Sequence, residues 1–168
     1  MEQAHARLRA ILDPVIGFQF TAATILFTLT GVLMGAQVLA RKGLDLPMLW
    51  AEDLTVFMFV WTTFLGAAVL YDRKESLAID TLVSQFSPST QLRVARCVDL
   101  LLLVALVYLC KLSWEFLVIQ KGMGHKLGGA TGIPSYVLTL SVLVGFLSMT
   151  ASTVASLVKP NAPARQTA

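Results

Sequence analysis

The sequence predicts an all-α integral membrane protein with four transmembrane helices and short amphipathic helices at the membrane interface. Apolar stretches occupy most of the 168 residues, and a helix needs about 20 apolar residues to cross a hydrocarbon core of about 30 Å. The predicted spans are about 15–40, 54–71, 97–119 and 133–158. Charged residues make up 14% of the chain, against about 25% in an ordinary soluble domain, and mean hydropathy is +0.72. We therefore assign 14–158 to one transmembrane domain.

The N-terminal segment 1–13 is predicted to lie at the cytoplasmic membrane surface. Apolar side chains between Ala4 and Leu12 share one helical face, which suits a short interfacial helix. Asp13 followed by Pro14 is typical of an N-cap and the first residue of a helix, so the first span is predicted to begin there. That span is too long for a signal-peptide core, and we expect it to remain as an anchor.

The central connection is predicted to form an interfacial arm over about 76–96. Its first part, Ser76–Phe86, places apolar residues on one helical face and polar residues on the other. Ser87 and Pro88 should end this helix and begin the next, which runs on into the third span. The glycine-rich connection 120–132 is predicted to be a flexible periplasmic loop, and 159–168 a cytoplasmic tail.

The distribution of cations predicts that both termini are cytoplasmic. Eight of the cations outside the spans fall in the N-terminal segment, the central connection and the C-terminal tail, and four fall in the other two connections. The eight are Arg7, Arg9, Arg73, Lys74, Arg93, Arg96, Lys159 and Arg165, and the four are Arg41, Lys42, Lys121 and Lys126. Lys and Arg favour the cytoplasmic side. No segment clusters enough cations to indicate nucleic-acid binding.

Small and weakly polar residues predict where helices pack, because lipid provides no hydrophobic force between helices. The first span has such a stripe at Gly17, Thr21, Thr24, Thr28, Gly31 and Gly35. The last span has another at Ser141, Gly145, Ser148, Ser152 and Ser156. Both stripes can pack the four helices together, and they also leave room for a helix from another chain.

Charges inside the third span are expected to be structural. Lys111 and Glu115 are one turn apart on the same face, which favours an ion pair. No proline interrupts a span, whereas transporter ion sites are typically built on broken helices. Cys97 and Cys110 lie too far apart on one helix to form a disulfide. We therefore expect no cofactor, no metal site and no enzymatic activity, and we do not expect the chain alone to be a transport pathway.

Three segments carry a family resemblance. They are Trp50-Ala-Glu52-Asp53-Leu, Val60-Trp61-Thr-Thr-Phe64-Leu-Gly66-Ala-Ala and Arg73-Lys-Glu-Ser-Leu-Ala-Ile-Asp80. They resemble the small transmembrane subunit, DctQ type, of tripartite ATP-independent periplasmic (TRAP) transporters, and Gly132-Ile-Pro134-Ser-Tyr136 is also similar to that family. The chain departs from it at Val56, where the family often has Arg, and at Ser76, where it often has His.

The resemblance implies a small subunit of a sodium-coupled secondary transporter for organic anions in the bacterial inner membrane. Its implied partners are a large membrane subunit of the DctM type and a periplasmic substrate-binding protein, with membrane lipid around them. The small subunit would act as a scaffold for the large one. The subunit-interface candidates are Gly31, Gly35, Trp50, Glu52, Asp53, Trp61, Gly66, Arg73, Asp80, Lys111 and Glu115.

Three other interpretations remain open. The small subunit of a tripartite tricarboxylate transporter has a similar size and span count. A four-span thiol oxidoreductase would need periplasmic cysteine pairs, which this sequence lacks. A self-associating small membrane protein or channel is the third, although no span carries a polar pore face with rings of charge.

Overall fold

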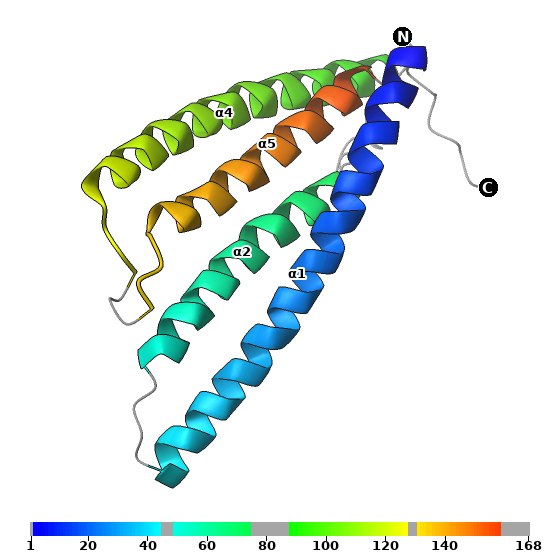
Figure 1. The fold of residues 1–168 in the computed structure, drawn as a ribbon. Helices are drawn as coiled ribbons and strands as arrows, with labels where there is room; N and C mark the ends of the chain where they lie inside the picture. Colours follow the sequence, from blue (N-terminus) through cyan, green and yellow to red (C-terminus); the bar gives the residue numbers. More distant parts are fainter. Residues whose placement is uncertain (1, 45–48, 75–87, 128–130, 159–168) are drawn as a thin grey trace, which may run out of the picture.

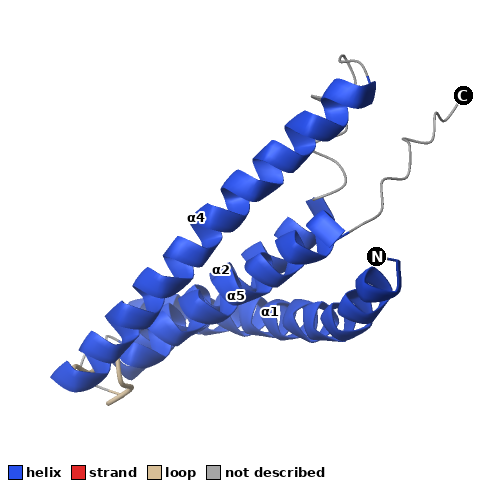
Figure 2. Cartoon of the chain, turned by 90° about the horizontal axis from the view of Figure 1, so that it is seen from above, coloured by secondary structure: helices blue, strands red, loops and turns tan. Residues whose placement is uncertain are grey.

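The computed structural model describes residues 2–44, 49–74, 88–127 and 131–158, and within these ranges the long elements are all helices. They are α1 (Glu2–Leu44), α2 (Leu49–Lys74), α4 (Pro88–Met123) and α5 (Tyr136–Val158). Each contains a stretch long and apolar enough to cross a membrane. The predicted all-α membrane fold with four spans is therefore confirmed (Figures 1 and 2). The predicted arm Ser76–Phe86, Asp80 within it, and the tail 159–168 lie outside the described residues.

The helices lie side by side in the order α4, α5, α2, α1 (Figure 1). α5 packs against α4 and α2 and makes a smaller contact with α1, while α1 packs mainly against α2. Among the described helices, α4 contacts α5 alone. α5 is accordingly the most buried span, with 33% of its apolar window buried against 11% for α1 and α4. The other described helices leave one broad face of α4 and of α1 open.

We name the two ends of this bundle by their connections. The loop end contains the end of α1, the start of α2 and the turn from α4 to α5. The terminal end contains the start of α1, the end of α2, the start of α4 and the end of α5.

α1 is one continuous helix, so the predicted break at Asp13 and Pro14 is wrong. Pro14 has no N–H and cannot bond the carbonyl four residues earlier, a loss that costs about 3 kcal/mol or more inside a helix. Packing on both sides of the proline offsets that cost. Leu12 and Ile16 belong to a buried cluster with Val69 of α2 and Ala155 of α5. The N-terminal segment is thus part of the first span's helix.

Other predicted boundaries agree with the structure to within a few residues. α4 begins at Pro88, as the Ser87-Pro88 pair predicts, because proline is well suited to the first turn of a helix. α2 begins at Leu49, before the predicted 54, and takes in the acidic residues ahead of the apolar run. α5 begins at Tyr136 and not at 133, because Ile133 and Pro134 belong to the preceding turn.

The turn between α4 and α5 is paired at its base, which the sequence did not indicate. Leu127 donates its N–H to the Ile133 carbonyl at 2.7 Å, and Ser135 donates to the His125 carbonyl at 2.9 Å. Gly124 follows α4 with φ 64°, the left-handed conformation that commonly ends a helix and suits glycine. The predicted loop 120–132 therefore begins too early, because 120–123 belong to α4, and two backbone hydrogen bonds join the two sides of the turn that follows.

Candidate functional site

The contact between α4 and α5 has polar pairs along its whole length. Thr139 donates to Gln120 at 2.8 Å near the loop end, and Ser156 donates to Asp99 at 2.9 Å near the terminal end. Between them the Cys110 thiol and Thr150 hydroxyl lie 3.7 Å apart. Such bonds hold helices together in lipid, where water cannot replace them. Asp99 therefore joins two helices.

Gly145 of α5 lies close to the backbone of Phe64 in α2. A Cβ atom at Gly145 would lie 3.0 Å from the Phe64 carbonyl oxygen, which is tighter than an ordinary van der Waals contact, so a larger residue there would require a small shift of the neighbouring helix. Ser141 and Ser152 of the same stripe are fully buried, and the Phe64 and Phe146 rings meet edge to face. The small-residue stripe of the last span therefore packs the chain's own helices together, as one of the two predicted readings had it.

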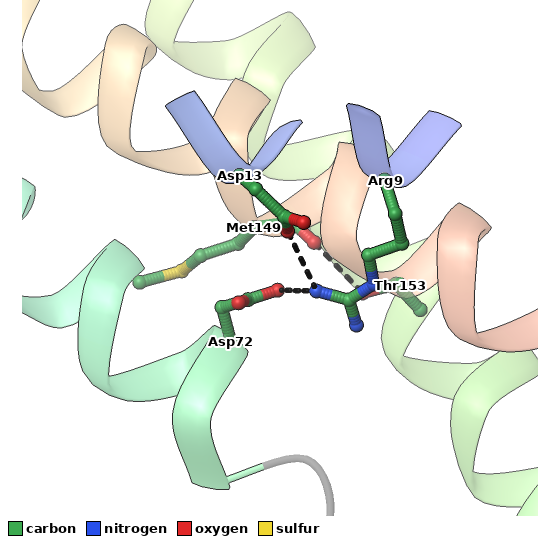
Figure 3. A network of polar contacts seen from close by, with 5 residues as sticks. All are labelled: Arg9, Asp13, Asp72, Met149 and Thr153. Carbon is green, nitrogen blue, oxygen red and sulfur yellow. Dashed lines mark hydrogen bonds and ion pairs between the residues drawn. The ribbon is translucent and has the colours of Figure 1, made fainter. Parts of the chain in front are cut away.

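An ion pair joins α1 to α2 at the terminal end (Figure 3). Arg9 lies 2.8 Å from the Asp72 carboxylate and 3.9 Å from that of Asp13. The Arg9 and Asp72 side chains are 27% and 12% exposed, so water screens their contact only in part. Nearby, the Tyr71 hydroxyl and the Thr153 hydroxyl share a hydrogen bond of 2.8 Å between α2 and α5. Sequence reasoning counted Arg9 as a topology signal and missed this pair.

The acids at the start of α2 have different surroundings. Asp53 is 7% exposed, and its Oδ2 accepts bonds from the Thr131 N–H at 3.1 Å and from the Thr131 hydroxyl at 3.0 Å. Glu52 is exposed, and Trp50 is 51% exposed beside it. Asp53 thus ties α2 to the turn between α4 and α5, while Glu52 and Trp50 face outward at the loop end.

The small-residue stripe of α1 is turned away from the other helices. Gly31 and Gly35 are exposed, and a Cβ atom at either would meet nothing within 4 Å. The stripe's threonine hydroxyls bond to carbonyls one turn earlier in the same helix, as Thr24 does to Phe20 at 2.8 Å. A different face of α1 is buried, and it includes Leu12, Ile16, Gln19, Ala23, Thr30 and Ala40. The stripe is therefore an exposed surface whose threonine hydroxyls are hydrogen-bonded within α1 itself.

The remaining predicted site residues lie apart from one another. Trp61 is partly buried, its ring lies 6.0 Å from that of Phe57, and its Nε1 is buried with no hydrogen-bond partner among the described residues. Gly66 has open space around it. Arg73 stacks its guanidinium 4.5 Å above the Phe20 ring, which joins α2 to α1. These three positions are not brought together into one site.

Lys111 and Glu115 form the predicted ion pair, with 3.8 Å between the charged atoms. Their side chains are 70% and 54% exposed and point away from the chain's own helices. Within the ranges that the structure describes, no group of three or more His, Cys, Asp or Glu side chains could hold a metal ion. The described polar side chains thus either join helices to one another or lie on the exposed surface.

Comparison with known proteins decides the family. Residues 30–161 match the family described as "Tripartite ATP-independent periplasmic transporters, DctQ component". This chain belongs to the DctQ family. The match covers α2, α4 and α5 and about the last third of α1, so the four-helix arrangement described above is that of a TRAP transporter component.

Two Haemophilus influenzae proteins are similar to this DctQ chain. One, whose description assigns it as a TRAP transporter small permease protein, is 22% identical over 89 residues, which are 53% of this chain and 55% of the relative. The other, the "Sialic acid TRAP transporter permease protein SiaT", is 30% identical over 66 residues, which are 39% of this chain and 11% of the relative. The matched segments therefore span about half of one relative and a small part of the other.

Proposed function

We propose that this DctQ protein is the small membrane subunit of a sodium-coupled, binding-protein-dependent transporter for organic anions, and that it acts as a fixed scaffold for the large transport subunit. The observation that carries the scaffold role is the contrast between the two small-residue stripes. The stripe of α5 is buried within the chain, while that of α1 is open along its length. A close-packing surface that none of the described helices covers suits a helix of another subunit.

The relative SiaT supports a large membrane partner. A segment similar to this chain makes up 11% of that permease protein, so the same kind of helices occurs there within a much larger chain. We infer that in this protein the corresponding larger part is a separate subunit of the DctM type. The sodium site and the substrate site would lie on that subunit, because the described spans here contain neither a helix break nor a metal-binding group.

Orientation follows from the cation count. We place the terminal end in the cytoplasm and the loop end in the periplasm of a bacterial inner membrane. In this orientation Trp50 and Glu52 lie at the periplasmic edge, exposed beside the turn that Asp53 holds. They are then available to contact the large subunit or the periplasmic substrate-binding protein.

Reconstitution tests the scaffold role. Liposomes should contain this chain alone, the large subunit alone, or both, each with the substrate-binding protein and an inward sodium gradient. We expect sodium-driven uptake of organic anion only when both membrane subunits are present. Uptake by this chain alone would contradict the proposal, and so would full uptake by the large subunit without it.

A further inference from the structure

An open groove lies between α2 and α4 toward the loop end, with α5 as its floor. In the described part of the chain α2 and α4 do not contact each other, whereas both pack against α5 (Figure 1). The groove has a volume of about 590 Å³. It lies along helices that are long and apolar enough to span a bilayer, so lipid or another membrane protein must cover it.

The lining of the groove becomes more polar toward the loop end, with Ser113 beside Leu112 at the inner end and Leu138 beside Thr139 at the outer end. Its inner walls are Val60 of α2 and Leu112 and Phe116 of α4, over Val142 of α5. Gln120 lies eight positions beyond Leu112, about 12 Å along α4, and Ser135 closes the groove at the start of α5. This gradient runs from the membrane interior toward one membrane surface.

The polar end of the groove has hydrogen-bond donors to spare. Gln120 uses its Oε1 to accept from Thr139, and its Nε2 has no partner among the described residues. The Ser135 hydroxyl also has no described partner, although the Ser135 N–H is bonded to the His125 carbonyl. Unpaired donors at the edge of a bilayer cost free energy unless an acceptor reaches them.

An exposed lysine lies on the turn that leads to Ser135. Lys126 pairs across the turn with Pro134, the neighbour of Ser135, and its side chain is exposed. The groove therefore offers apolar walls and then neutral donors, and the turn beside its polar end carries an exposed lysine.

We propose that this groove binds one phospholipid with an anionic headgroup from the leaflet at the loop end. One acyl chain lies along Val60, Leu112 and Phe116. The ester carbonyls accept hydrogen bonds from Gln120 and Ser135, and the phosphate lies near Lys126. Ser113 also lines the groove. With the acyl chain bound, its hydroxyl donates to a backbone carbonyl of its own helix, as the Thr63 hydroxyl does to the Phe59 carbonyl.

A helix from another protein fits this lining less well. The backbone carbonyls of a transmembrane helix are already bonded within the helix, so it could pair with Gln120 and Ser135 only through polar side chains placed at the same depth. A lipid has free ester and phosphate oxygens at the depth where these donors lie. The order of the lining, and not only its apolar character, therefore favours a lipid.

Native mass spectrometry tests whether the groove binds a lipid. The samples are this protein alone and this protein bound to its large subunit, each after removal of copurified lipid. The probes are phosphatidylglycerol and phosphatidylcholine with the same acyl chains. We expect saturable binding of one phosphatidylglycerol, about fivefold tighter than phosphatidylcholine because one lysine faces the phosphate. Lys126→Gln should abolish that preference. Lipid binding is measured without substrate, so the result does not depend on the proposed transport role.

Two tryptophan substitutions fill the groove from different helices. Val60→Trp and Val142→Trp should each weaken phosphatidylglycerol binding by about tenfold or more, because the bulky ring takes the place of the acyl chain. Val104→Trp is the matched control, since Val104 is 65% exposed on α4 outside the groove. Equal lipid binding by all three variants would mean surrounding bilayer lipid only. Loss of the lipid on addition of the large subunit would make the groove a protein interface. Either result overturns the proposal, as does an absence of saturable binding by the unsubstituted chain.

Discussion

Asp53 accepts two hydrogen bonds from Thr131, a residue 78 positions away in the sequence. One comes from the backbone N–H and one from the hydroxyl, so a single carboxylate fixes both the backbone and the side chain of Thr131 in the turn before α5. The start of α2 and the start of α5 are thereby fixed to each other at the loop end.

Asp53→Ala should destabilise the isolated protein in detergent. Hydrogen bonds to a charged group contribute about 1.5–3 kcal/mol, and Thr131 would lose its acceptor. Thermal unfolding followed by intrinsic fluorescence measures the loss. Glu52→Gln is the control, because Glu52 is exposed and its change should stay within about 0.5 kcal/mol. Equal midpoints for the two variants would show that the Thr131 bonds contribute nothing to stability.

Glu52→Gln should instead lower transport if the loop-end surface contacts another subunit. We expect uptake in the reconstituted three-part system to fall severalfold, normalised to the amount of inserted subunit. Because Glu52 is exposed, the thermal stability of the chain itself should not change. Unchanged uptake would leave Glu52 as an acid that favours the start of a helix, worth about 0.3–1 kcal/mol.

Arg9 and Asp72 should show energetic coupling in a double-mutant cycle. Their contact is short and only partly exposed, so Arg9→Ala and Asp72→Asn should each cost about 1–3 kcal/mol, with a clearly smaller combined cost than the sum. Asp13→Asn is the control, because Asp13 is 66% exposed and lies 3.9 Å from Arg9. Additive costs for Arg9 and Asp72 would mean that they do not interact in the folded protein.

Gly145→Ala should destabilise the chain even without any partner. Its new methyl group would lie 3.0 Å from the Phe64 carbonyl, and α2 and α5 would have to move apart. Overpacking of this kind costs about 1–3 kcal/mol. Thermal unfolding is again the measurement, and Gly66→Ala, which meets nothing within 4 Å, is the control. If the two alanines behave alike, the close approach of the helices does not exist.

Gly31→Leu should leave the stability of the isolated chain unchanged and weaken its association with the large subunit. Nothing lies within 4 Å of a Cβ atom there, so the isolated chain should be as stable as before or slightly more so, since leucine favours helix over glycine by several tenths of a kcal/mol. Copurification with the large subunit should fall, because the leucine side chain keeps a partner helix away from the backbone. Copurification at the original level would place this face of α1 in lipid.

Patterns local to one helix were readable from the sequence. Apolar length identified the four spans, the Ser87-Pro88 pair located the start of α4, and the spacing of Lys111 and Glu115 identified their ion pair. Each of these features depends on residues that are neighbours along one chain segment.

Features that join distant segments were not readable. α1 has two faces whose residues recur at helical spacing, so the sequence alone does not show which one is buried. The packing against α2 and α5 buries the face with Gln19 and leaves the glycine stripe exposed. The local sequence at Pro14 is typical of a helix start, and the contacts that keep the helix continuous there, those of Leu12 and Ile16, are with residues on other helices. The partners of Asp53 and Arg9 are on other elements for the same reason.

The place of α5 between α4 and α2 has a consequence for biosynthesis. α5 is the last of these helices to leave the ribosome, yet α4 has no described helix other than α5 to pack against. α1 and α2 can pair as soon as both have emerged, while α4 must wait in the bilayer, with Asp99 and Gln120 lacking their partners, until the final span is inserted. Quality control by a membrane protease would therefore act most readily on chains stalled before α5, and such chains should have the shortest lifetimes in the cell.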